Sequence, residues 1–282
     1  TWANIRGVLT NNIQNLKLYE ENDYAAKKID VWGISDKNLF LESNKILKQQ
    51  TKPFFAVIQT ADNHRPYTIP AEDKDEFKLL SYSSDSLKRF GFESNEEMNA
   101  FRYTDFGYQK FMEAAQKEAY FKNTIFVFVG DHGIRYNGSL EYFPKAWTEQ
   151  GLTCEHVPLL FYAPGLLKPQ RISSVASQID ILPTIASLAK IPYNNSSMGR
   201  NLFDTIPASF PQFGLVSAKQ HYAFVIDHDV HTIGLVSNQY YYLKNLKTGK
   251  EEFVSMKNND PVPVNEVTES EKKDLQKLTD AY

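Results

Sequence analysis

The sequence predicts an α/β fold with a predominantly parallel central sheet flanked by helices, together with a small C-terminal antiparallel subdomain. Three short apolar segments, residues 54–61, 124–129 and 157–165, have the composition of buried strands, and segments with helical periodicity separate them. Strands that alternate with helices are typical of a parallel sheet covered on both faces. After about residue 210, short alternating segments between turn residues indicate an antiparallel meander.

The helices of the expected α/β body are indicated by periodicity and by helix-starting residues. Residues 39–49 have the composition of a helix, and residues 177–191 are predicted to form another, entered through Asp180 with Pro183 near its first turn. A third helix is expected where residues recur at steps of four, three and four, which places on one face Tyr108, Met112, Ala115 and Ala119.

Two domains are expected along the chain. Residues 1–209 carry the α/β pattern, and residues 210–282 carry the antiparallel pattern, which is broken by the turn sequences "SNQ" and "KTGK". Thr268 and Glu271 have the spacing of a capping box, so a closing helix is expected over residues 269–281.

The composition restricts the classes of function. The chain has 282 residues, 23% of them charged, and a formal net charge of -3, which argues against a general nucleic-acid-binding protein. The single cysteine, Cys154, excludes an internal disulfide and a cysteine-rich zinc knuckle. No stretch approaches 18 consecutive apolar residues, so no membrane span is expected within these residues.

Polar residues follow two of the predicted strands at the point where each strand ends. The sequence "DNH" at residues 62–64 follows the first strand, and "GDHG" at residues 130–133 follows the second. Sites in open α/β sheets form beyond the carboxyl ends of the strands. We therefore expect His64 to lie within roughly 10 Å of Asp131, in one substrate pocket.

Asp131 and His132 are the candidate metal ligands. A carboxylate oxygen and an imidazole nitrogen suit zinc or manganese, and Gly130 and Gly133 on either side would allow a tight turn close to a bound ion. An Asp–His pair at a strand end can also be purely structural, and so can a single histidine such as His64. Both interpretations stay open on these residues alone.

Five segments, taken in order, resemble a known family. They are "WGISD" (32–36), "FFAVIQTADNHRPY" (54–67), "FVGDHG" (128–133), "VPLLFYAPG" (157–165) and "SQIDILPTI" (177–185). The chain resembles the sulfatase-like branch of the alkaline phosphatase superfamily, and within it the lipoteichoic acid synthase and phosphoglycerol transferase group. The resemblance covers most of residues 1–200 and implies that residues 1–209 are the C-terminal portion of a catalytic domain.

The resemblance implies roles for individual residues. Asp131 and His132 would bind a divalent metal, and His64 would be a catalytic group that donates a hydrogen bond to a phosphate oxygen or to the leaving group. Substrate-binding roles are implied for Trp2 and Arg6 at the headgroup and for further residues near the phosphate, Asn63, Arg65 and Arg135. Arg65 and Arg135 could equally be solvated charges at loop tips, although a guanidinium matches phosphate oxygens well.

The resemblance also implies a reaction. It is the metal-dependent transfer of a phosphoglycerol-type headgroup from a phospholipid to an envelope glycan or polymer acceptor, through a covalent phospho-threonine. Manganese is the expected metal, with zinc or magnesium as alternatives. Two other functions remain open: a sulfatase or phosphodiesterase that hydrolyses its substrate, and a non-catalytic domain that binds headgroups or glycans.

The nucleophile and the remaining metal ligand are expected upstream of this chain, in a region that would also tether the protein to the membrane. The catalytic domain is then expected at the extracytoplasmic face, and the chain by itself is expected to be inactive. Thr1 and Thr10 are more simply structural or solvated, and "CEHVP" around Cys154 lacks the sulfatase C/S-x-P-x-R pattern. His228 and His231 are a candidate second pair of metal ligands, but positions three apart face opposite sides of a strand, so joint ligation would need a bulge or a turn.

Single residues outside these motifs have local explanations. His156 precedes the third predicted strand and is expected at a loop or strand edge. Asp36 and Asp180 are expected to cap local turns or helices.

Overall fold

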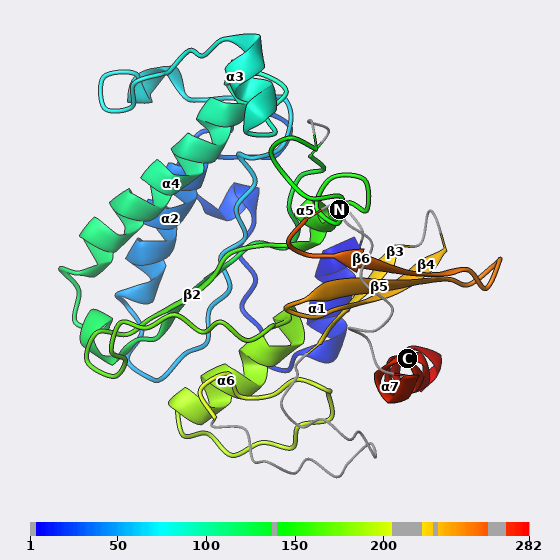
Figure 1. Ribbon diagram of the computed structural model, residues 1–282. Coiled ribbons are helices and arrows are strands. Elements are labelled where there is room, and N and C mark those ends of the chain that lie inside the picture. Colours follow the sequence, from blue (N-terminus) through cyan, green and yellow to red (C-terminus); the bar gives the residue numbers. More distant parts are fainter. Residues whose placement is uncertain (1–3, 137–139, 205–221, 228–230, 259–268, 282) are drawn as a thin grey trace. The chain divides into compact units, whose positions relative to one another are not determined.

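The computed structural model (Figure 1) describes residues 4–136, 140–204, 222–227, 231–258 and 269–281. The chain forms two compact units, one made of residues Thr1–Leu87 and Phe92–Lys122 and the other of residues Lys88–Gly91 and Asn123–Tyr282. The predicted domain boundary at residue 209 falls outside the described residues and stays a prediction. Trp2, Thr1 and His228 also lie outside the described residues.

The first unit is mainly helical. Its helices are α1 (Ile5–Asn12), α2 (Asp36–Leu47), α3 (Ser84–Arg89) and α4 (Asn95–Ala115), and short 3-10 turns lie at Glu21–Asp23, Ala71–Asp73 and Phe121–Asn123. The last two residues of α3 and the last residue of the third turn belong to the second unit. Figure 1 shows α2 and α4 side by side. The predicted helices are therefore confirmed over most of their length: α2 contains residues 39–47 of the expected 39–49, and α4 contains Tyr108, Met112 and Ala115 but ends before Ala119.

Helices α2 and α4 begin at serine caps and pack through aromatic residues. The Ser35 hydroxyl accepts a hydrogen bond from the amide of Asn38, which satisfies one of the donors that every helix start leaves unpaired. Between the helices, the ring of Phe40 lies 5.1 Å from that of Tyr108 and 5.2 Å from that of Phe111. Gly107 lets the helices approach, since a Cβ there would lie 3.3 Å from the backbone nitrogen of Lys37.

The segment 54–61 is not a ladder-forming strand, contrary to the prediction. No strand of the described residues pairs with it, and the side chains of Phe55 and Val57 are 71% and 80% exposed. An apolar run shows that side chains favour burial, but a strand also needs a neighbour to accept and donate its backbone hydrogen bonds. The polar residues that follow the segment, from Asp62 on, form a turn.

The second unit contains the remaining elements. They are β1 (Phe126–Val129), α5 (Leu152–Glu155), β2 (Leu159–Tyr162), a 3-10 turn at Gln178–Asp180, α6 (Ile181–Leu188), β3 (Ala223–Asp227), β4 (Thr232–Val236), β5 (Tyr240–Asn245), β6 (Glu251–Ser255) and α7 (Glu269–Ala281). The strands and the helix predicted over residues 124–129, 157–165 and 177–191 are thus present, each shorter than expected.

Strands β1 and β2 pair antiparallel, with Phe126 opposite Tyr162 and Val129 opposite Leu159. All ladders among the described strands are antiparallel, so these residues do not show the parallel pairing that was predicted. Short apolar runs indicate burial and strand length, but they carry no information on strand direction. The α/β class itself is confirmed by the folds of the solved structures described below.

The C-terminal antiparallel sheet has the order β3-β4-β5-β6, as the alternating pattern predicts. Successive side chains of β5 point to opposite faces, so Tyr240 and Tyr242 pack with Leu275 of α7, while Tyr241 and Leu243 pack with a different buried cluster. Figure 1 shows the four strands with α7 beside them. The closing helix is therefore confirmed, and it is held by burial of the Leu275 side chain.

Candidate functional site

The turn that carries Asp131 and His132 leaves the end of β1 and is anchored by backbone groups on two sides. Gly133 donates its amide hydrogen to the carbonyl oxygen of Cys154 at 2.6 Å, and Gly130 donates to that of Pro158 at 3.4 Å. The Gln178 side chain donates to the carbonyl oxygens of Gly130 and Asp131, both at 2.8 Å. Three segments therefore fix the backbone from which the two candidate ligands project.

The two glycines of this turn permit close contact with the neighbouring segment. A Cβ at Gly133 would lie 2.1 Å from the carbonyl oxygen of Thr153, and one at Gly130 would lie 3.0 Å from the Val157 side chain. Neither glycine has the positive φ that usually demands glycine. Both residues are therefore small because residues 153–157 pack directly against them. The conformation of the turn itself does not require glycine.

The side chains of Asp131 and His132 are adjacent and exposed. His132 Nε2 lies 3.9 Å from Asp131 Oδ2, and the two side chains are 62% and 80% exposed. His132 Nδ1 lies 2.8 Å from the carbonyl oxygen of Gly133. Because a carbonyl oxygen only accepts hydrogen bonds, the proton belongs on Nδ1 and the lone pair on Nε2, as metal-binding histidines require.

This donor set fits a divalent metal as two of its ligands. Two ligands about 2.1 Å from one ion lie about 3.4 Å apart at the tetrahedral angle, so Asp131 Oδ2 and His132 Nε2, which are 3.9 Å apart, would share an ion after approaching by about half an ångström. A catalytic site of this kind usually has three protein ligands. Within the described residues, however, no group of three or more histidine, cysteine or acidic side chains is positioned to hold an ion.

The loop that carries Asn63, His64 and Arg65 belongs to the first unit. The imidazole ring of His64 stacks on the indole of Trp32, with ring centroids 4.4 Å apart and planes inclined by 27°. The Trp32 Nε1 donates a hydrogen bond to the carbonyl oxygen of Arg65 at 2.7 Å. Asn63 Oδ1 lies 2.8 Å from the Thr104 hydroxyl. Trp32 thus belongs to the candidate site, although the sequence reasoning assigned it no role.

The three candidate arginines each lie near a carboxylate. Arg65 is ion-paired with Glu93, whose charge raises the pKa of the guanidinium. Arg6 in α1 is ion-paired with Glu20, and Arg6 Nε lies 3.2 Å from Glu20 Oε1. In the second unit, a terminal nitrogen of Arg135 lies 4.0 Å from the nearest carboxylate oxygen of Asp227. Each arginine is more than half exposed, so these contacts leave room for a phosphate.

Two buried carboxyl groups lie directly behind the His64 loop. Asp36 Oδ1 accepts hydrogen bonds from the amides of Ala61 and Asp62, at 2.8 and 3.3 Å, and Asp62 Oδ2 accepts one from the amide of Asp36 at 2.7 Å. Burial, and then the charge of Asp36, raises the pKa of Asp62 to about 8, and burial also raises the pKa of Asp36. Neither contact is predictable locally, because residues 36 and 62 are distant in sequence.

Asp36 and Asp180 were both expected to cap turns or helices. Asp180 does so, because it accepts hydrogen bonds from the amides of Ser177 and Arg200 at 2.9 and 2.8 Å. For Asp36 the expectation was wrong: Ser35 caps α2, and the Asp36 carboxylate bonds to the 61–62 backbone instead. A buried acid gains most from the donors that tertiary packing brings to it.

The remaining single residues agree with their simpler interpretations. His156 is exposed, and its ring meets Trp147 edge to face at 5.1 Å. The Thr10 hydroxyl donates to the carbonyl oxygen of Arg6 at 2.8 Å inside α1, which is a local helical contact. His231 lies at the start of β4 with a φ of 55°, while its proposed co-ligand lies outside the described residues.

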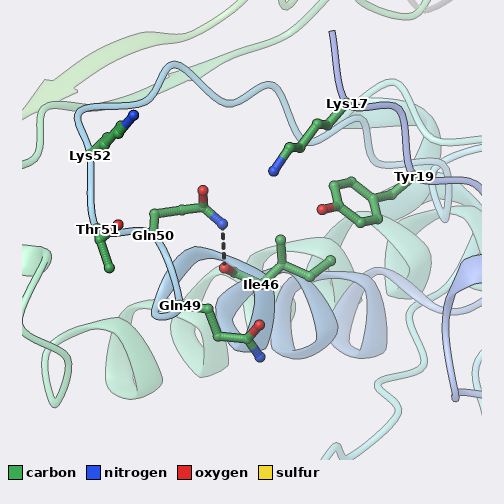
Figure 2. Close-up of a pocket in the computed structure, with 7 residues that line it drawn as sticks. All are labelled: Lys17, Tyr19, Ile46, Gln49, Gln50, Thr51 and Lys52. Carbon is green, nitrogen blue, oxygen red and sulfur yellow. Dashed lines mark hydrogen bonds between the residues drawn. The ribbon is translucent and has the colours of Figure 1, made fainter. Parts of the chain in front are cut away.

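The first unit also contains a pocket of about 510 Å³ that includes none of the predicted site residues. Figure 2 shows its lining, in which the Gln50 side chain donates to the carbonyl oxygen of Ile46 at 3.0 Å. Ligand pockets are usually lined by apolar groups with a few polar ones. This pocket is lined mainly by polar side chains, namely Lys17, Tyr19, Gln49, Gln50, Thr51 and Lys52 beside Ile46.

His64 and Asp131 lie in different compact units. The structure thus builds each half of the candidate site by itself, and the predicted distance between these two residues stays a prediction. Among the helices that the structure describes, none has the length and apolar character needed to cross a membrane.

Comparison with known proteins identifies relatives for most of these residues. A lipoteichoic acid synthase-like protein, YvgJ of Bacillus subtilis, is 30% identical over 167 residues, which are 56% of this chain and 25% of that protein. Lipoteichoic acid synthase of Staphylococcus aureus is 25% identical over 191 residues, or 64% of this chain and 28% of that protein. Arylsulfatase K of Gallus gallus is 29% identical over 154 residues, or 50% of this chain and 28% of that protein.

Solved structures show the same fold. An alkaline phosphatase superfamily protein from Vibrio parahaemolyticus matches with a TM-score of 0.66 and 22% identity, over 93% of this chain and 58% of that chain. The lipoteichoic acid synthase LtaP from Listeria monocytogenes matches with a TM-score of 0.63 and 19% identity, over 93% of this chain and 62% of that chain. These structural likenesses concern the fold alone.

The family follows from the extent of the sequence match. The chain spans about a quarter of the length of these curated relatives: 25% of the YvgJ protein, and 28% of both the arylsulfatase and the Staphylococcus aureus synthase. The Sulfatase family profile, however, matches residues 6–191, which contain the GDHG turn, the His64 loop and the Gln178 anchor. The chain therefore belongs to the sulfatase family, in the sulfatase-like branch of the alkaline phosphatase superfamily.

Proposed function

We propose that the chain is part of a metal-dependent enzyme that transfers a phosphoglycerol-type headgroup from a phospholipid to an envelope glycan or polymer. The observation that carries this proposal is the anchored turn with Asp131 and His132, whose donor atoms can share one divalent ion. The similarity to lipoteichoic acid synthases over more than half of the chain supports the choice of a phosphate substrate over other substrates of the superfamily.

Asp131 and His132 would hold the metal, which we propose to be manganese, with zinc or magnesium as alternatives. A carboxylate is an ordinary ligand of all three ions, whereas an imidazole suits zinc best and magnesium least, since magnesium prefers oxygen ligands. When bound, a divalent ion supplies positive charge that stabilises the phosphate oxygens and favours ionisation of a nearby hydroxyl.

The residues of the chain would act on the phosphate and on the groups that leave and enter. His64 would donate a hydrogen bond to a phosphate oxygen or to the departing alcohol, which stabilises the negative charge that builds up there. Arg65 and Asn63 on the same loop, together with Arg135, would contact the phosphate, and Trp2 and Arg6 would contact the headgroup.

The proposed reaction has two balanced steps. A threonine oxygen forms a bond to phosphorus, the bond from phosphorus to the lipid alcohol breaks, and the alcohol departs with a proton. An acceptor hydroxyl then loses its proton and its oxygen forms a bond to the same phosphorus, while the bond from phosphorus to the threonine oxygen breaks and the threonine takes up a proton. We propose that residues outside these 282 supply the threonine and the remaining metal ligand, and that a neighbouring region tethers the enzyme to the extracytoplasmic face of the membrane.

A second candidate function is hydrolysis of a sulfate or phosphate ester, which the similarity to an arylsulfatase favours. In that case water, rather than an acceptor hydroxyl, would complete the second step. A domain that binds headgroups or glycans without turnover is the non-catalytic alternative.

The test compares substrates in the full-length protein at saturating manganese. We expect release of diacylglycerol from a fluorescent phosphatidylglycerol, and no release of 4-nitrophenol from 4-nitrophenyl sulfate. The Asp131→Ala variant should be inactive, while an Asp75→Ala variant, which removes an exposed aspartate of the first unit, should keep its activity. The purified 282-residue chain assayed beside it should be inactive.

Three outcomes would change the proposal. Turnover of the sulfate ester, but not of the lipid, would favour a sulfatase. Binding of the lipid without turnover would favour the non-catalytic alternative. Turnover by the 282-residue chain that is lost in Asp131→Ala would place the nucleophile within these residues.

A further inference from the structure

The segment "WGISD", residues 32–36, contacts the His64 loop at both of its ends. At one end, the Trp32 indole lies against the His64 ring, and at the other end, the Asp36 carboxylate bonds to the backbone of residues 61–62. All of these residues belong to the first compact unit, so the contacts lie within one body. The segment was noted in the sequence only as part of a family resemblance.

The Trp32 contacts fix the His64 ring and the backbone that follows it. The rings are 4.4 Å apart and inclined by 27°, which restricts rotation of the imidazole about its side-chain bonds. The hydrogen bond from Trp32 Nε1 to the carbonyl oxygen of Arg65, at 2.7 Å, holds the residue that follows the histidine. One indole therefore restrains both the His64 side chain and the peptide group after it.

The Asp36 contacts fix the backbone before His64. The Asp36 side chain is almost fully buried and accepts hydrogen bonds from two successive amides, those of Ala61 and Asp62. Asp62 returns one to the amide of Asp36, and the Thr104 hydroxyl of α4 completes the set at 2.8 Å from Asp36 Oδ2. A buried carboxyl with several donors is held in one orientation, because any other would leave polar groups unpaired.

We propose that residues 32–36 position His64 for its reaction: Trp32 holds the imidazole ring, and Asp36 holds the backbone from which the ring projects. Trp32 and Asp36 are positioning residues, since Trp32 contacts the His64 ring and Asp36 binds the backbone of residues 61–62 that leads to it. The catalytic part of this inference rests on the proposed function, in which His64 acts at the phosphate. The structural part stands on the contacts alone.

The structural part is tested by NMR of the 282-residue chain labelled at histidine. A proton above an aromatic ring is shielded, so the His64 ring resonances should move downfield in Trp32→Leu and stay near their native position in Trp32→Phe, which keeps a ring at this place. The other histidine resonances should not move. A Phe90→Leu variant removes a 70% exposed aromatic elsewhere and should leave the His64 resonances unchanged.

The catalytic part is tested by kinetics of the full-length protein. Trp32→Leu should lower kcat about tenfold with little change in KM, because displacement of a reacting group by a fraction of an ångström weakens the transition state more than the bound substrate. Trp32→Phe should recover most of the loss. In a His64→Ala background, Trp32→Leu should have no further effect, since Trp32 acts through that histidine.

The outcomes separate this inference from the proposed function. His64 resonances that stay in place in Trp32→Leu would overturn the inference, whatever the activity. A full additional loss of kcat in the His64→Ala background would also overturn it, because Trp32 would then act independently. If the resonances move as expected while no phosphodiester is turned over, the positioning by Trp32 stands and the proposed function fails. Circular dichroism checks that each variant is folded, and Trp32→Phe serves as the test if Trp32→Leu is not.

Discussion

Single residues in this chain show how local chemistry and tertiary packing divide the construction of a site. Asp131 and His132 are recognisable in the sequence because this polar pair directly follows the end of an apolar strand. The reason for Gly133 is not recognisable there, since it depends on the Thr153 carbonyl oxygen that packs against it from a different segment. At this scale the sequence shows which residues can react, and packing decides where they are held.

Gly133→Ala should disturb the candidate metal site without changing a ligand. A Cβ would lie 2.1 Å from the Thr153 carbonyl oxygen, so the backbone must shift, and overpacking of this kind costs about 1–3 kcal/mol. Gly130→Ala should be milder, because its Cβ would meet only the Val157 side chain at 3.0 Å. Urea unfolding and manganese affinity measured on both variants check this order, and equal effects would contradict it.

Asp62 should make the stability of the chain depend on pH. Its pKa of about 8 in the folded chain lies above the ordinary value of 3.8, so the folded chain holds this proton more tightly than the unfolded chain. The carboxyl group therefore contributes less to stability as pH rises from about 4 to about 8, by at most about 1.4 kcal/mol per pH unit. Asp36, Asp30 and Asp73 add to the shift through their charges.

The measurement is the urea midpoint at several pH values between 5 and 8, in the wild-type chain and in Asp62→Asn. The wild-type chain should lose stability over this range, and the variant should lose less, because the amide does not ionise. A variant with the same pH dependence as the wild-type chain would show that Asp62 does not titrate in this range.

Elements are predicted well where their own side chains determine them. Helix α4 and the strands of the C-terminal sheet follow from periodicity, since their apolar residues recur at the spacing of a helix or alternate along a strand. The segment 54–61 and the direction of β2 are not predicted, because both depend on a neighbouring strand rather than on local composition. The anchoring role of Gln178 is not predictable either, because its hydrogen bonds reach Gly130 and Asp131 in a different segment of the chain.

The 3-10 turn at Gln178–Asp180 should hold the metal-binding turn through one side chain. Gln178→Ala removes two hydrogen bonds to the carbonyl oxygens of Gly130 and Asp131, so amide exchange at residues 131–133 should become faster and manganese affinity should fall about tenfold. Gln116→Ala, at an exposed glutamine after α4, is the matched control. Unchanged exchange and affinity in Gln178→Ala would show that the anchor has no role.

At the scale of the whole molecule, the account requires that the two halves of the candidate site come together. The His64 loop lies in one compact unit and the Asp131 turn in the other, and the match to the Sulfatase family includes residues of both. The sequence predicts their proximity from the rule that sites form beyond strand ends. That rule does not by itself specify how two units dock.

Manganese bound at Asp131 and His132 should broaden the His64 ring resonances strongly, if His64 lies within roughly 10 Å as predicted for a shared pocket. Magnesium, which is not paramagnetic, should leave the line widths unchanged. The His156 resonances should broaden as well and serve as the positive control, because the carbonyl oxygen of His156 lies 3.4 Å from the Cβ position of Gly133 in the metal-binding turn. Sharp His64 lines at saturating manganese would show that the two residues do not form one site.

The central claim is that Asp131 and His132 bind the metal while His64 acts at the phosphate, and manganese titration of the wild-type protein and four variants tests it most directly. Isothermal titration of the full-length protein should give at least about tenfold weaker binding in Asp131→Ala and in His132→Ala, and unchanged binding in the Asp75→Ala control. His64→Ala should bind manganese as tightly as the wild-type protein while turning over phosphodiester more slowly. Equal loss of manganese affinity in His64→Ala, or normal affinity in Asp131→Ala, would contradict the account.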